Sequence, residues 1–432
     1  MSTARAPGTT VESAGSDDCM NLVVFIEHRF DQTPDGAVWT QTMFARPFWS
    51  RYLDVFDHVR VVARLRTVAT VPGTWQRADG DGVSFAALPF YIGPLQYLRQ
   101  RRRLTEAAVA AVEPGDAVVF RAPSAIAGQI EPALRRAGHP YGVEVLGDPY
   151  DVFAPGAVRH PLRRFFRWWF PKKLTRLCAG AAATGYVTEH ALQRRYPPTP
   201  GAFTTYYSDV ELSNDTFVAA PRPPRRAGPF TLVTVGSLAQ MYKAPDVQID
   251  AIARLVKEGL DLRLVLVGDG KHRSELEARA AALGIAERVV FRGQLTAGIA
   301  VRAELDAADV FCLPSRTEGM PRAMIEAMAR GLPCIGSTMG GIPELLPAAD
   351  MVSPGDVAAL AKTIRAVVTD PERMAQMSAR NLARARDYQE DELRARRTRF
   401  YRALRERTEA WREHEGAPGK RRIAQSVSAT AR

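Results

Sequence analysis

Two glutamates with an eight-residue spacing, Glu318 and Glu326, lie where a strand-like segment is followed by a helix-like one. The apolar stretch predicts a buried strand that ends at Leu313, and Pro321 suits the first turn of the following helix. The free backbone N–H groups and the positive end of the helix dipole there form a receptor for a diphosphate. The loop carboxylate of Glu318 can accept hydrogen bonds from sugar hydroxyls. Glu326, about one turn inside the helix, can accept them from ribose hydroxyls.

Either glutamate alone is equally compatible with a solvated surface position, so the neighbouring segments decide between the two interpretations. Residues 331–333 read Gly-Leu-Pro and residues 340–344 read Gly-Gly-Ile-Pro-Glu. Before them, Val-Gly-Ser-Leu at 235–238 leads to Tyr-Lys-Ala-Pro-Asp at 242–246, and residues 264–270 end in Gly-Asp-Gly. From about residue 230 to 346 this order of segments resembles the retaining glycosyltransferases of family 4.

The resemblance implies a fold class, which is α/β of the GT-B type with two Rossmann-like doubly wound domains facing a cleft. It places the donor on the C-terminal domain and the acceptor on the N-terminal one. Lys243 matches the lysine that contacts the donor phosphates in relatives, where an ammonium neutralises charge on the departing nucleoside diphosphate. Glu318 then contacts the donor sugar and Glu326 the ribose, and the segment around them, Gly319, Met320, Pro321 and Arg322, completes the donor site.

Three positions depart from the family pattern. Ser237 stands where many relatives carry an arginine that binds phosphate. Gly36 falls in the loop that closes over the donor phosphate in relatives, but Asp35 replaces the first of the usual paired glycines. Asp148 occupies a stretch where relatives often place a histidine near the reacting carbon, and it is the candidate replacement; an aspartate before Pro149 is otherwise a common turn former.

The implied activity is hexosyltransferase-like transfer from a UDP- or GDP-linked sugar, with retention and without an obligatory metal ion. The nucleotide sugar is a substrate, so no cofactor is expected. The acceptor is left open, with a lipid-linked molecule or another cell-envelope or polysaccharide precursor as the candidate. Two alternatives remain, a nucleotide-sugar-binding protein without turnover and a nucleotide-sugar epimerase. The seven histidines are dispersed, and no residues are spaced as metal ligands.

The elements that must position these residues follow from the chain's 432 residues, enough for two or three domains. Strand-like and helix-like stretches alternate, which predicts parallel sheets covered by helices. In the N-terminal half a strand at 21–27, a polar loop at 31–36 and a helix from Val38 are expected. The predicted organisation is a disordered leader at 1–18, an N-terminal domain at 19–218, a proline-rich linker at 219–229, a C-terminal domain at 230–388, a helix at 389–412 packing across both domains, and a basic tail at 413–432.

The net charge of +11 favours an anionic partner, and nucleic acid, lipid headgroups and sugar nucleotides all fit this condition. The family resemblance selects the nucleotide sugar and excludes nucleic acid. Many of the basic residues gather in the N-terminal half, which keeps an anionic membrane surface as a further candidate partner. They include Arg99, Arg101, Arg102, Arg103, Arg163, Arg164, Arg167, Lys172, Lys173 and Arg176.

One segment of that half, residues 162–173, has the pattern of a basic amphipathic helix ended by Pro171. An apolar face is predicted from Leu162, Phe165, Phe166 and Trp169. The predicted membrane contacts are Arg163, Arg164, Arg167, Trp168 and Trp169. A core-facing helix with a solvated basic side is the alternative. Because cysteines are few and no apolar run could span a bilayer, a cytoplasmic protein is expected, and the basic clusters make the inner face of the plasma membrane a candidate location.

Overall fold

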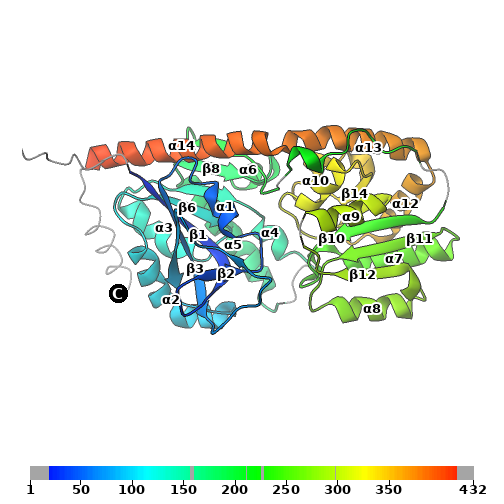
Figure 1. Ribbon diagram of the computed structural model, residues 1–432, viewed down its shortest axis with the longest axis horizontal. Helices are drawn as coiled ribbons and strands as arrows, with labels where there is room; N and C mark the ends of the chain where they lie inside the picture. The colour runs from blue at the N-terminus through cyan, green and yellow to red at the C-terminus, as the bar shows by residue number, and fades with distance from the viewer. Residues whose placement is uncertain (1–18, 156–159, 211, 225–227, 297, 416–432) are drawn as a thin grey trace, which may run out of the picture.

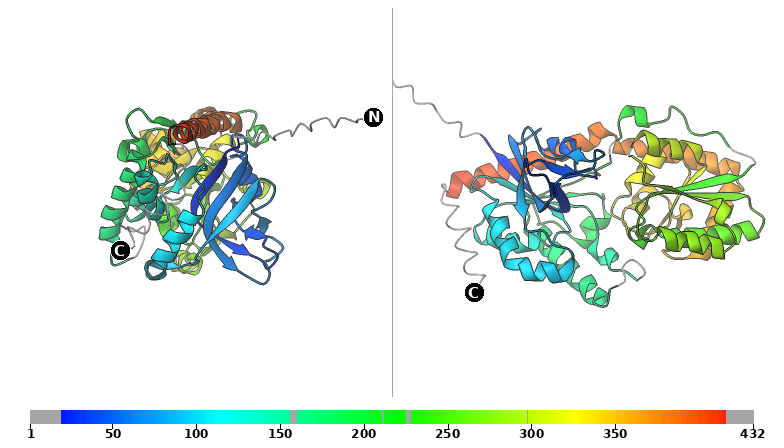
Figure 2. Two further views of the ribbon diagram at one scale, coloured as in Figure 1. Left: turned by 90° about the vertical axis from the view of Figure 1, so that its left-hand side faces the viewer. Right: turned by 60° about the horizontal axis from the view of Figure 1, so that its bottom comes forward.

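A computed structural model describes residues 19–155, 160–210, 212–224, 228–296 and 298–415, which form two domains (Figure 1). The predicted leader at 1–18, residues 225–227 of the linker and residues 416–432 of the tail lie outside the described residues. Each domain has its own sheet with helices around it (Figure 2). The predicted α/β class with two Rossmann-like domains is confirmed.

The N-terminal sheet has seven parallel strands in the order β5-β3-β1-β6-β7-β8-β9, with the β2-β4 pair added at the end of β1. The strands are β1 (Asn21–Gln32), β2 (Val38–Thr40), β3 (His58–Thr67), β4 (Gln76–Arg77), β5 (Val83–Leu88), β6 (Ala117–Ala122), β7 (Gly142–Val145), β8 (Ala183–Tyr186) and β9 (Phe203–Tyr206). The helices are α1 (Arg46–Ser50), α2 (Gly93–Ala110), α3 (Ala127–Arg136), α4 (Pro149–Val152), α5 (Arg163–Ala179) and α6 (Ala191–Arg195).

The predicted helix from Val38 is wrong, because this residue begins β2, which pairs antiparallel with the end of β1. A tight turn reverses the chain: the Thr33 N–H donates to the Ala37 carbonyl at 3.0 Å, and Gly36 has a positive φ of 85°. Glycine adopts that conformation at no steric cost. The Trp39 indole N–H also donates to Thr33 Oγ1 at 3.0 Å. These turn contacts outweigh the local helical pattern, and the first helix begins at Arg46.

The C-terminal sheet is parallel throughout, in the order β12-β11-β10-β13-β14-β15. Its strands are β10 (Phe230–Val235), β11 (Leu262–Val267), β12 (Val289–Gly293), β13 (Val310–Leu313), β14 (Cys334–Ser337) and β15 (Met351–Val352). Its helices are α7 (Pro245–Lys257), α8 (Arg273–Ala282), α9 (Ile299–Ala307), α10 (Arg322–Ala329), α11 (Ile342–Leu345), α12 (Val357–Val368) and α13 (Pro371–Ala385). The strand order reverses between β10 and β13, and ligands of such sheets bind outside the carboxyl ends of the strands at that point.

The alternation of side chains along the C-terminal strands produces two separate apolar layers. Leu232 and Leu264 point into one layer with α7, α8 and α12, whereas their neighbours Val233 and Val265 point into the other. The second layer contains α9 and α10 and is continuous with the core of the N-terminal domain. Both faces of the sheet are therefore covered, as expected of parallel strands with runs of apolar residues.

A long final helix, α14 (Glu390–Glu415), follows α13 and packs on β8 and β9 of the N-terminal sheet. Figure 1 shows α13 and α14 running along one side of both domains. Three apolar side chains of α14 are buried, namely Leu393, Phe400 and Leu404. The chain therefore crosses between the domains at the linker and again at the start of α14.

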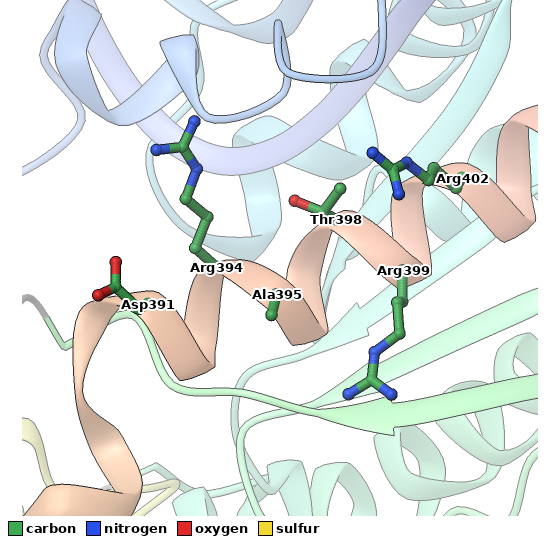
Figure 3. A pocket seen from close by; sticks show the side chains of 6 residues that line it. All are labelled: Asp391, Arg394, Ala395, Thr398, Arg399 and Arg402. Atoms are coloured by element: carbon green, nitrogen blue, oxygen red, sulfur yellow. The ribbon is translucent and has the colours of Figure 1, made fainter.

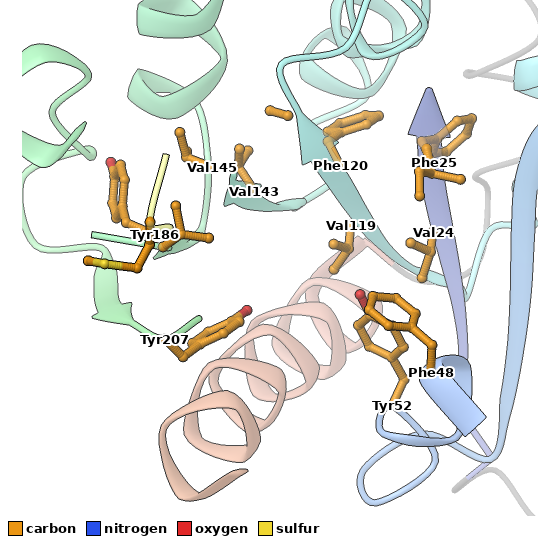
Figure 4. Close-up of a cluster of buried hydrophobic side chains, with 14 of the residues drawn as sticks. Val24, Phe25, Phe48, Tyr52, Val119, Phe120, Val143, Val145, Tyr186 and Tyr207 are labelled. Atoms are coloured by element: carbon orange, nitrogen blue, oxygen red, sulfur yellow. The ribbon is translucent and has the colours of Figure 1, made fainter. Parts of the chain in front are cut away.

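A buried polar cluster lies under α14, beside the apolar side chains in Figure 4. Arg121 donates to Glu144 at 2.6 Å and to Asp209 at 2.5 Å. Tyr52 and Tyr207, whose rings flank α14 in Figure 4, donate to the same glutamate at 2.9 and 2.7 Å. Buried charges persist where they are paired and hydrogen-bonded, so this cluster is a structural element of the N-terminal core.

Candidate active site

The structure brings Lys243 and Glu318 together at the carboxyl ends of β10 and β13, the point of strand-order reversal. Lys243 ends a 3-10 turn (Met241–Lys243), and its ammonium donates directly to Glu318 Oε1. Ser315 Oγ donates to the same oxygen at 2.7 Å. The side chain of Glu318 is only 6% exposed and that of Lys243 is 26% exposed. A nearly buried carboxylate and a cation open to solvent thus form the centre of the site.

A second ion pair joins the two loops that carry these residues. Arg316 binds both carboxylate oxygens of Asp246 at 2.8 and 2.7 Å. Its backbone N–H donates to the Tyr242 carbonyl at 2.7 Å, and its guanidinium reaches the Met241 carbonyl at 3.0 Å. Bidentate arginine–carboxylate pairs fix geometry as well as charge. The positions of Lys243 and Glu318 relative to each other are therefore set by contacts on both sides.

The residue after Lys243 has an unusual backbone. Ala244 has a φ of 52°, the single positive φ of a non-glycine residue in the described part of the chain. A left-handed conformation costs an L-residue roughly 1–2 kcal/mol. Such strain clusters at functional sites, where the surrounding structure holds it. Here Pro245 begins α7 immediately afterwards, so the strained residue directs the chain from the lysine into the helix.

Close backbone contacts surround the loop that carries Glu318. A Cβ built on Gly340 would lie 2.2 Å from the Glu318 carbonyl oxygen, and one on Gly319 would lie 2.4 Å from the Leu146 carbonyl oxygen. The Gly341 N–H donates to the Gly319 carbonyl at 2.7 Å. The loop that carries Glu318 is thus held between the Gly-Gly turn of its own domain and the end of β7 of the other domain.

The other predicted donor residues lie on the same segment or on the loop after β10. Met320 is buried near the Tyr388 hydroxyl, Pro321 precedes α10, and Glu326 lies half-buried about one turn inside that helix. Arg322 is exposed, and its Nη1 lies 2.8 Å from Met43 Sδ of the N-terminal domain.

Ser237 is exposed after β10, and its hydroxyl accepts the Ala239 N–H at 3.1 Å. It therefore lies in the loop after β10 and stabilises its own turn.

Two predicted site residues of the N-terminal domain have contacts within the protein that explain their positions without a ligand. Gly36 is at the tip of the β1-β2 hairpin, where its N–H donates to the Thr33 carbonyl at 2.9 Å. Asp148 is buried and accepts the Tyr150 N–H at 2.8 Å, which caps α4. Arg195 and the Tyr196 hydroxyl bind the same carboxylate. These contacts fit the turn-forming interpretation of Asp148.

A residue that the sequence did not single out ties the domains together. The carboxylate of Glu344 accepts N–H groups of Glu189, His190 and Ala191 at 2.6, 3.0 and 2.8 Å. These three residues lead into α6 of the N-terminal domain, whereas Glu344 belongs to α11 of the C-terminal one. Glu344 is the last residue of the Gly-Gly-Ile-Pro-Glu motif, but its partners lie about 150 residues away and no local pattern indicates them.

The basic amphipathic segment forms α5, which does not end at Pro171 as predicted. The helix runs on to Ala179, since Leu174, Leu177 and Cys178 beyond the proline are buried in the core and hold it in place. The exposed apolar face consists of Leu162, Phe165 and Trp168, so Trp169 is not on it.

The predicted membrane contacts of this helix therefore differ in their surroundings. Arg163 donates to the Phe153 carbonyl, and Arg167 lies 3.9 Å from the centre of the Tyr150 ring. Arg164 and Trp168 are exposed, with Lys172 over the Trp168 ring. Trp169 is half-buried beneath Lys173. Within the described residues, no helix is both long and apolar enough to cross a bilayer.

A shallow cavity of about 510 Å³ lies on α14, far in sequence from the donor loops (Figure 3). All of its lining residues come from that single helix, namely Asp391, Arg394, Ala395, Thr398, Arg399 and Arg402. Arg394 is already bound to Asp54 at 3.0 Å, and Figure 3 shows Arg394 and Arg399 pointing in opposite directions. The side chains do not converge on a common point, which argues against a ligand site.

Comparisons with known proteins match the part of the chain that carries these loops. The model of the family "Glycosyl transferases group 1" matches residues 229–370. Protein CapJ of Staphylococcus aureus is 26% identical over 324 residues, 74% of this chain and 80% of that protein. A GDP-mannose-dependent monoacylated alpha-(1-6)-phosphatidylinositol monomannoside mannosyltransferase of Corynebacterium glutamicum is 35% identical over 146 residues, 32% of this chain but only 38% of that protein.

The fold has a counterpart among solved structures. Sucrose-phosphate synthase from Thermosynechococcus elongatus superposes with a TM-score of 0.64 and 18% identity, covering 89% of this chain and 99% of that one. This likeness concerns the arrangement of both domains, whereas the family match concerns the domain that carries Lys243 and Glu318. Together they show that the chain is a glycosyltransferase of the GT-B type, and that its residues 229–370 match the model of the glycosyl transferases group 1 family.

Proposed function

We propose that this protein transfers a sugar from a UDP- or GDP-linked donor to an acceptor, with retention of configuration and without an obligatory metal ion. The observation that carries the proposal is the pair of Lys243 and Glu318 at the strand-order reversal of the C-terminal sheet. An ammonium suits a diphosphate, and a carboxylate suits sugar hydroxyls. Retention and the assignment to family 4 rest on the resemblance of the donor segments. On donor binding, the phosphates would replace Glu318 as the partner of the Lys243 ammonium. Glu318 would then accept hydrogen bonds from the sugar hydroxyls.

Backbone groups support the same placement of the donor. α10 begins directly after Pro321, so its first N–H groups and its dipole face the loop that holds Glu318. A diphosphate there meets Lys243 on one side and the start of the helix on the other. The charge that develops on the leaving group would then be stabilised by preorganised groups. No carboxylate nucleophile is assigned, so a same-face displacement is the proposed course. In that reaction the leaving phosphate oxygen can take the proton of the acceptor hydroxyl.

The test is a panel of UDP-, GDP- and ADP-sugars offered to the full chain. A donor bound only to the folded state raises the apparent melting temperature by mass action, so the panel first identifies the nucleotide. Incubation of that donor with candidate acceptors should release nucleoside diphosphate, and NMR of the product should show the donor's anomeric configuration. EDTA should leave the rate unchanged. Failure of the whole panel to turn over would exclude the transferase proposal.

One observation favours a second candidate, a nucleotide-sugar-binding protein without turnover. Asp148, the proposed substitute for the family histidine, is engaged by Arg195 and Tyr196. The N-terminal domain then offers no assigned side chain near the reacting carbon. Product analysis separates the candidates: transfer gives a glycosylated acceptor, epimerisation gives an altered donor sugar, and pure binding gives neither.

For Glu326→Ala we expect a higher KM for the donor with little change in kcat. Ribose is not altered in the reaction, so its contacts hold about equally in the substrate complex and in the transition state. The KM for the acceptor should stay the same, which serves as the internal control. Steady-state kinetics with each substrate varied in turn measures both constants, and a change confined to kcat would contradict the ribose assignment.

A lipid-linked acceptor at the inner face of the plasma membrane is part of the proposal. The name of the mannosyltransferase relative describes a phosphatidylinositol mannoside as its acceptor. In this chain α5 presents Leu162, Phe165 and Trp168 to solvent beside Arg164 and Lys172. Aromatic and basic residues on one exposed face suit the interface of an anionic bilayer. This placement would bring the acceptor domain to a substrate embedded in the membrane.

The double variant Arg164→Gln and Lys172→Gln should therefore weaken binding to vesicles that contain anionic lipid. About 1 kcal/mol per basic residue gives roughly a 30-fold loss for the pair. Co-sedimentation at rising salt measures it. The matched control is Arg254→Gln with Lys257→Gln, which removes the same charge from α7 of the other domain. Equal binding by both double variants, or no binding by the unaltered protein, would leave a water-soluble acceptor as the better assignment.

A further inference from the structure

A second cavity, of about 620 Å³, opens in the N-terminal domain where β1 and β3 end. Its walls come from the β1-β2 hairpin, from β3 and from the segment that leads into α2, elements that lie close together in Figure 1. Nothing in the donor segment lines it. In a doubly wound sheet the carboxyl ends of the strands are the usual place for a ligand, and the strand order of this sheet reverses at β1.

The charges in this cavity do not cancel. Arg66 binds Asp31 through two hydrogen bonds of 2.8 and 2.7 Å, and Arg64 lies 3.5 Å from Glu27. These two pairs are neutral as units. Arg29 is exposed in the same cavity, and no carboxylate of the described residues forms an ion pair with it. One uncompensated guanidinium therefore faces the cavity, and a guanidinium binds phosphate or carboxylate groups in preference to neutral ones.

The remaining polar and aromatic groups suit a sugar-bearing ligand. Burial, together with Arg29 and Arg64, lowers the pKa of His28 to about 4, so the imidazole is neutral at pH 7. It lies 3.4 Å from Thr40 Oγ1 and 3.2 Å from Thr42 Oγ1. A neutral imidazole and two hydroxyls provide both donors and acceptors for hydroxyl groups. The cavity thus combines hydrogen-bonding groups with a single free positive charge.

Apolar surface continues from the mouth of the cavity onto α2. Ile92 lines the cavity and is 57% exposed. Leu95 and Leu98 follow at intervals of three residues and are 70% and 61% exposed. Ile92 is the residue just before α2, and the three-residue spacing of Leu95 and Leu98 keeps those two side chains on one side of the helix. Contiguous exposed apolar side chains beside a binding pocket mark a surface for an apolar ligand.

Another part of the cavity wall leads to the loop that carries Glu318. Thr42 lines the cavity, and the next residue, Met43, places its Sδ 2.8 Å from Nη1 of Arg322. Arg322 opens α10, the helix that follows Glu318. A ligand in the cavity would therefore lie beside the donor loops, with its apolar part leaving in the direction of α2.

On the basis of the function proposed above, we propose that this cavity binds the acceptor and that the acceptor is a lipid with a phosphate-bearing headgroup. Arg29 binds the phosphate, and Ile92, Leu95 and Leu98 contact the hydrocarbon chain. His28 and the threonines beside it hydrogen-bond to the headgroup. The guanidinium matches the phosphate, the imidazole and hydroxyl groups match the polar headgroup, and the exposed apolar side chains match the hydrocarbon chain.

The test uses farnesyl phosphate as the probe, with farnesol and inorganic phosphate as its two halves. Calorimetry on the full chain, without detergent and below the aggregation concentration of the probe, should give tighter binding for farnesyl phosphate than for either half. Arg29→Gln should weaken that binding about tenfold, the loss of one charge-assisted contact. Leu95→Gln with Leu98→Gln should bring the affinity down to that of inorganic phosphate. Arg103→Gln, an equal charge change on the exposed part of α2 outside the cavity, is the matched control and should bind normally.

The outcomes separate this inference from the function on which it rests. If Arg29→Gln binds farnesyl phosphate as tightly as Arg103→Gln does, or if the unaltered protein prefers neither the phosphate nor the chain, the cavity assignment is overturned. Nucleotide-sugar binding by Arg29→Gln, measured by thermal shift, should be unchanged in either case. Absence of any stabilisation of the unaltered protein by nucleotide sugars would instead overturn the proposed function.

Discussion

Replacing Lys243 or Glu318 by alanine is expected to lower kcat by about 10²–10³-fold, because removing one preorganised charge contact costs about 2.7–4 kcal/mol in the transition state. Lys243 is the cation at the strand-order reversal that can reach a departing diphosphate, and Glu318 is the carboxylate that holds it. Ser315 keeps its place next to Glu318 in the lysine variant, so the loop itself should remain. Initial rates at saturating donor and acceptor measure the effect.

Stability has to be measured alongside the rates. Glu318 is nearly buried, so Lys243→Ala leaves a carboxylate without its ion-pair partner and should lower the melting temperature as well. Rates are therefore compared at a temperature well below the melting temperatures of the unaltered protein and of the variants. Lys257→Ala, an exposed lysine at the other end of α7, is the matched control and should keep both rate and stability. Near-normal turnover by the Lys243 and Glu318 variants would remove these residues from the donor site.

The C-terminal domain could be predicted from sequence because local pattern and fold agree there. Strands such as β10 and β11 are short apolar runs, and α7 begins at a proline directly after a turn, so boundaries follow from residue types. The helices and strands of the N-terminal half were harder to predict from local patterns. The Val38 segment pairs with β1 across a turn, and α5 continues through Pro171 because residues beyond it are buried. Both outcomes depend on tertiary contacts that outweigh local propensity.

For the site, the residue types were predictable and their partners were not. The motif spacing marked Lys243 and Glu318, but only the fold shows that they pair. The contact of Glu344 with α6 joins residues from different domains, and a sequence carries no signal for it without the fold. Asp148 was chosen by its position in the sequence. Only the fold shows that its carboxylate binds Arg195 and Tyr196.

Gly340→Ala is expected to lower kcat/KM by about 100-fold, although residue 340 is not assigned to contact any substrate. The added Cβ would lie 2.2 Å from the Glu318 carbonyl oxygen, which is backbone and cannot rotate away. Relief of that contact moves the loop that carries Glu318, and a displacement of about 1 Å in a catalytic group can cost about 10²-fold. The same substitution also places alanine at a φ of 55°, which costs roughly 1–2 kcal/mol of stability.

Gly284→Ala separates the displacement of Glu318 from the backbone strain. Gly284 has a φ of 71°, and a Cβ there would meet nothing within 4 Å. Both variants should lose melting temperature through the strained φ, and Gly340→Ala should lose more because of the added clash, whereas only Gly340→Ala should lose activity. Because Lys243 remains in place in Gly340→Ala, nucleotide binding should be retained in large part while transfer falls. Equal activity of the two variants would mean that the loop absorbs the added methyl group without moving Glu318, and that the position of this carboxylate does not depend on the Gly-Gly turn.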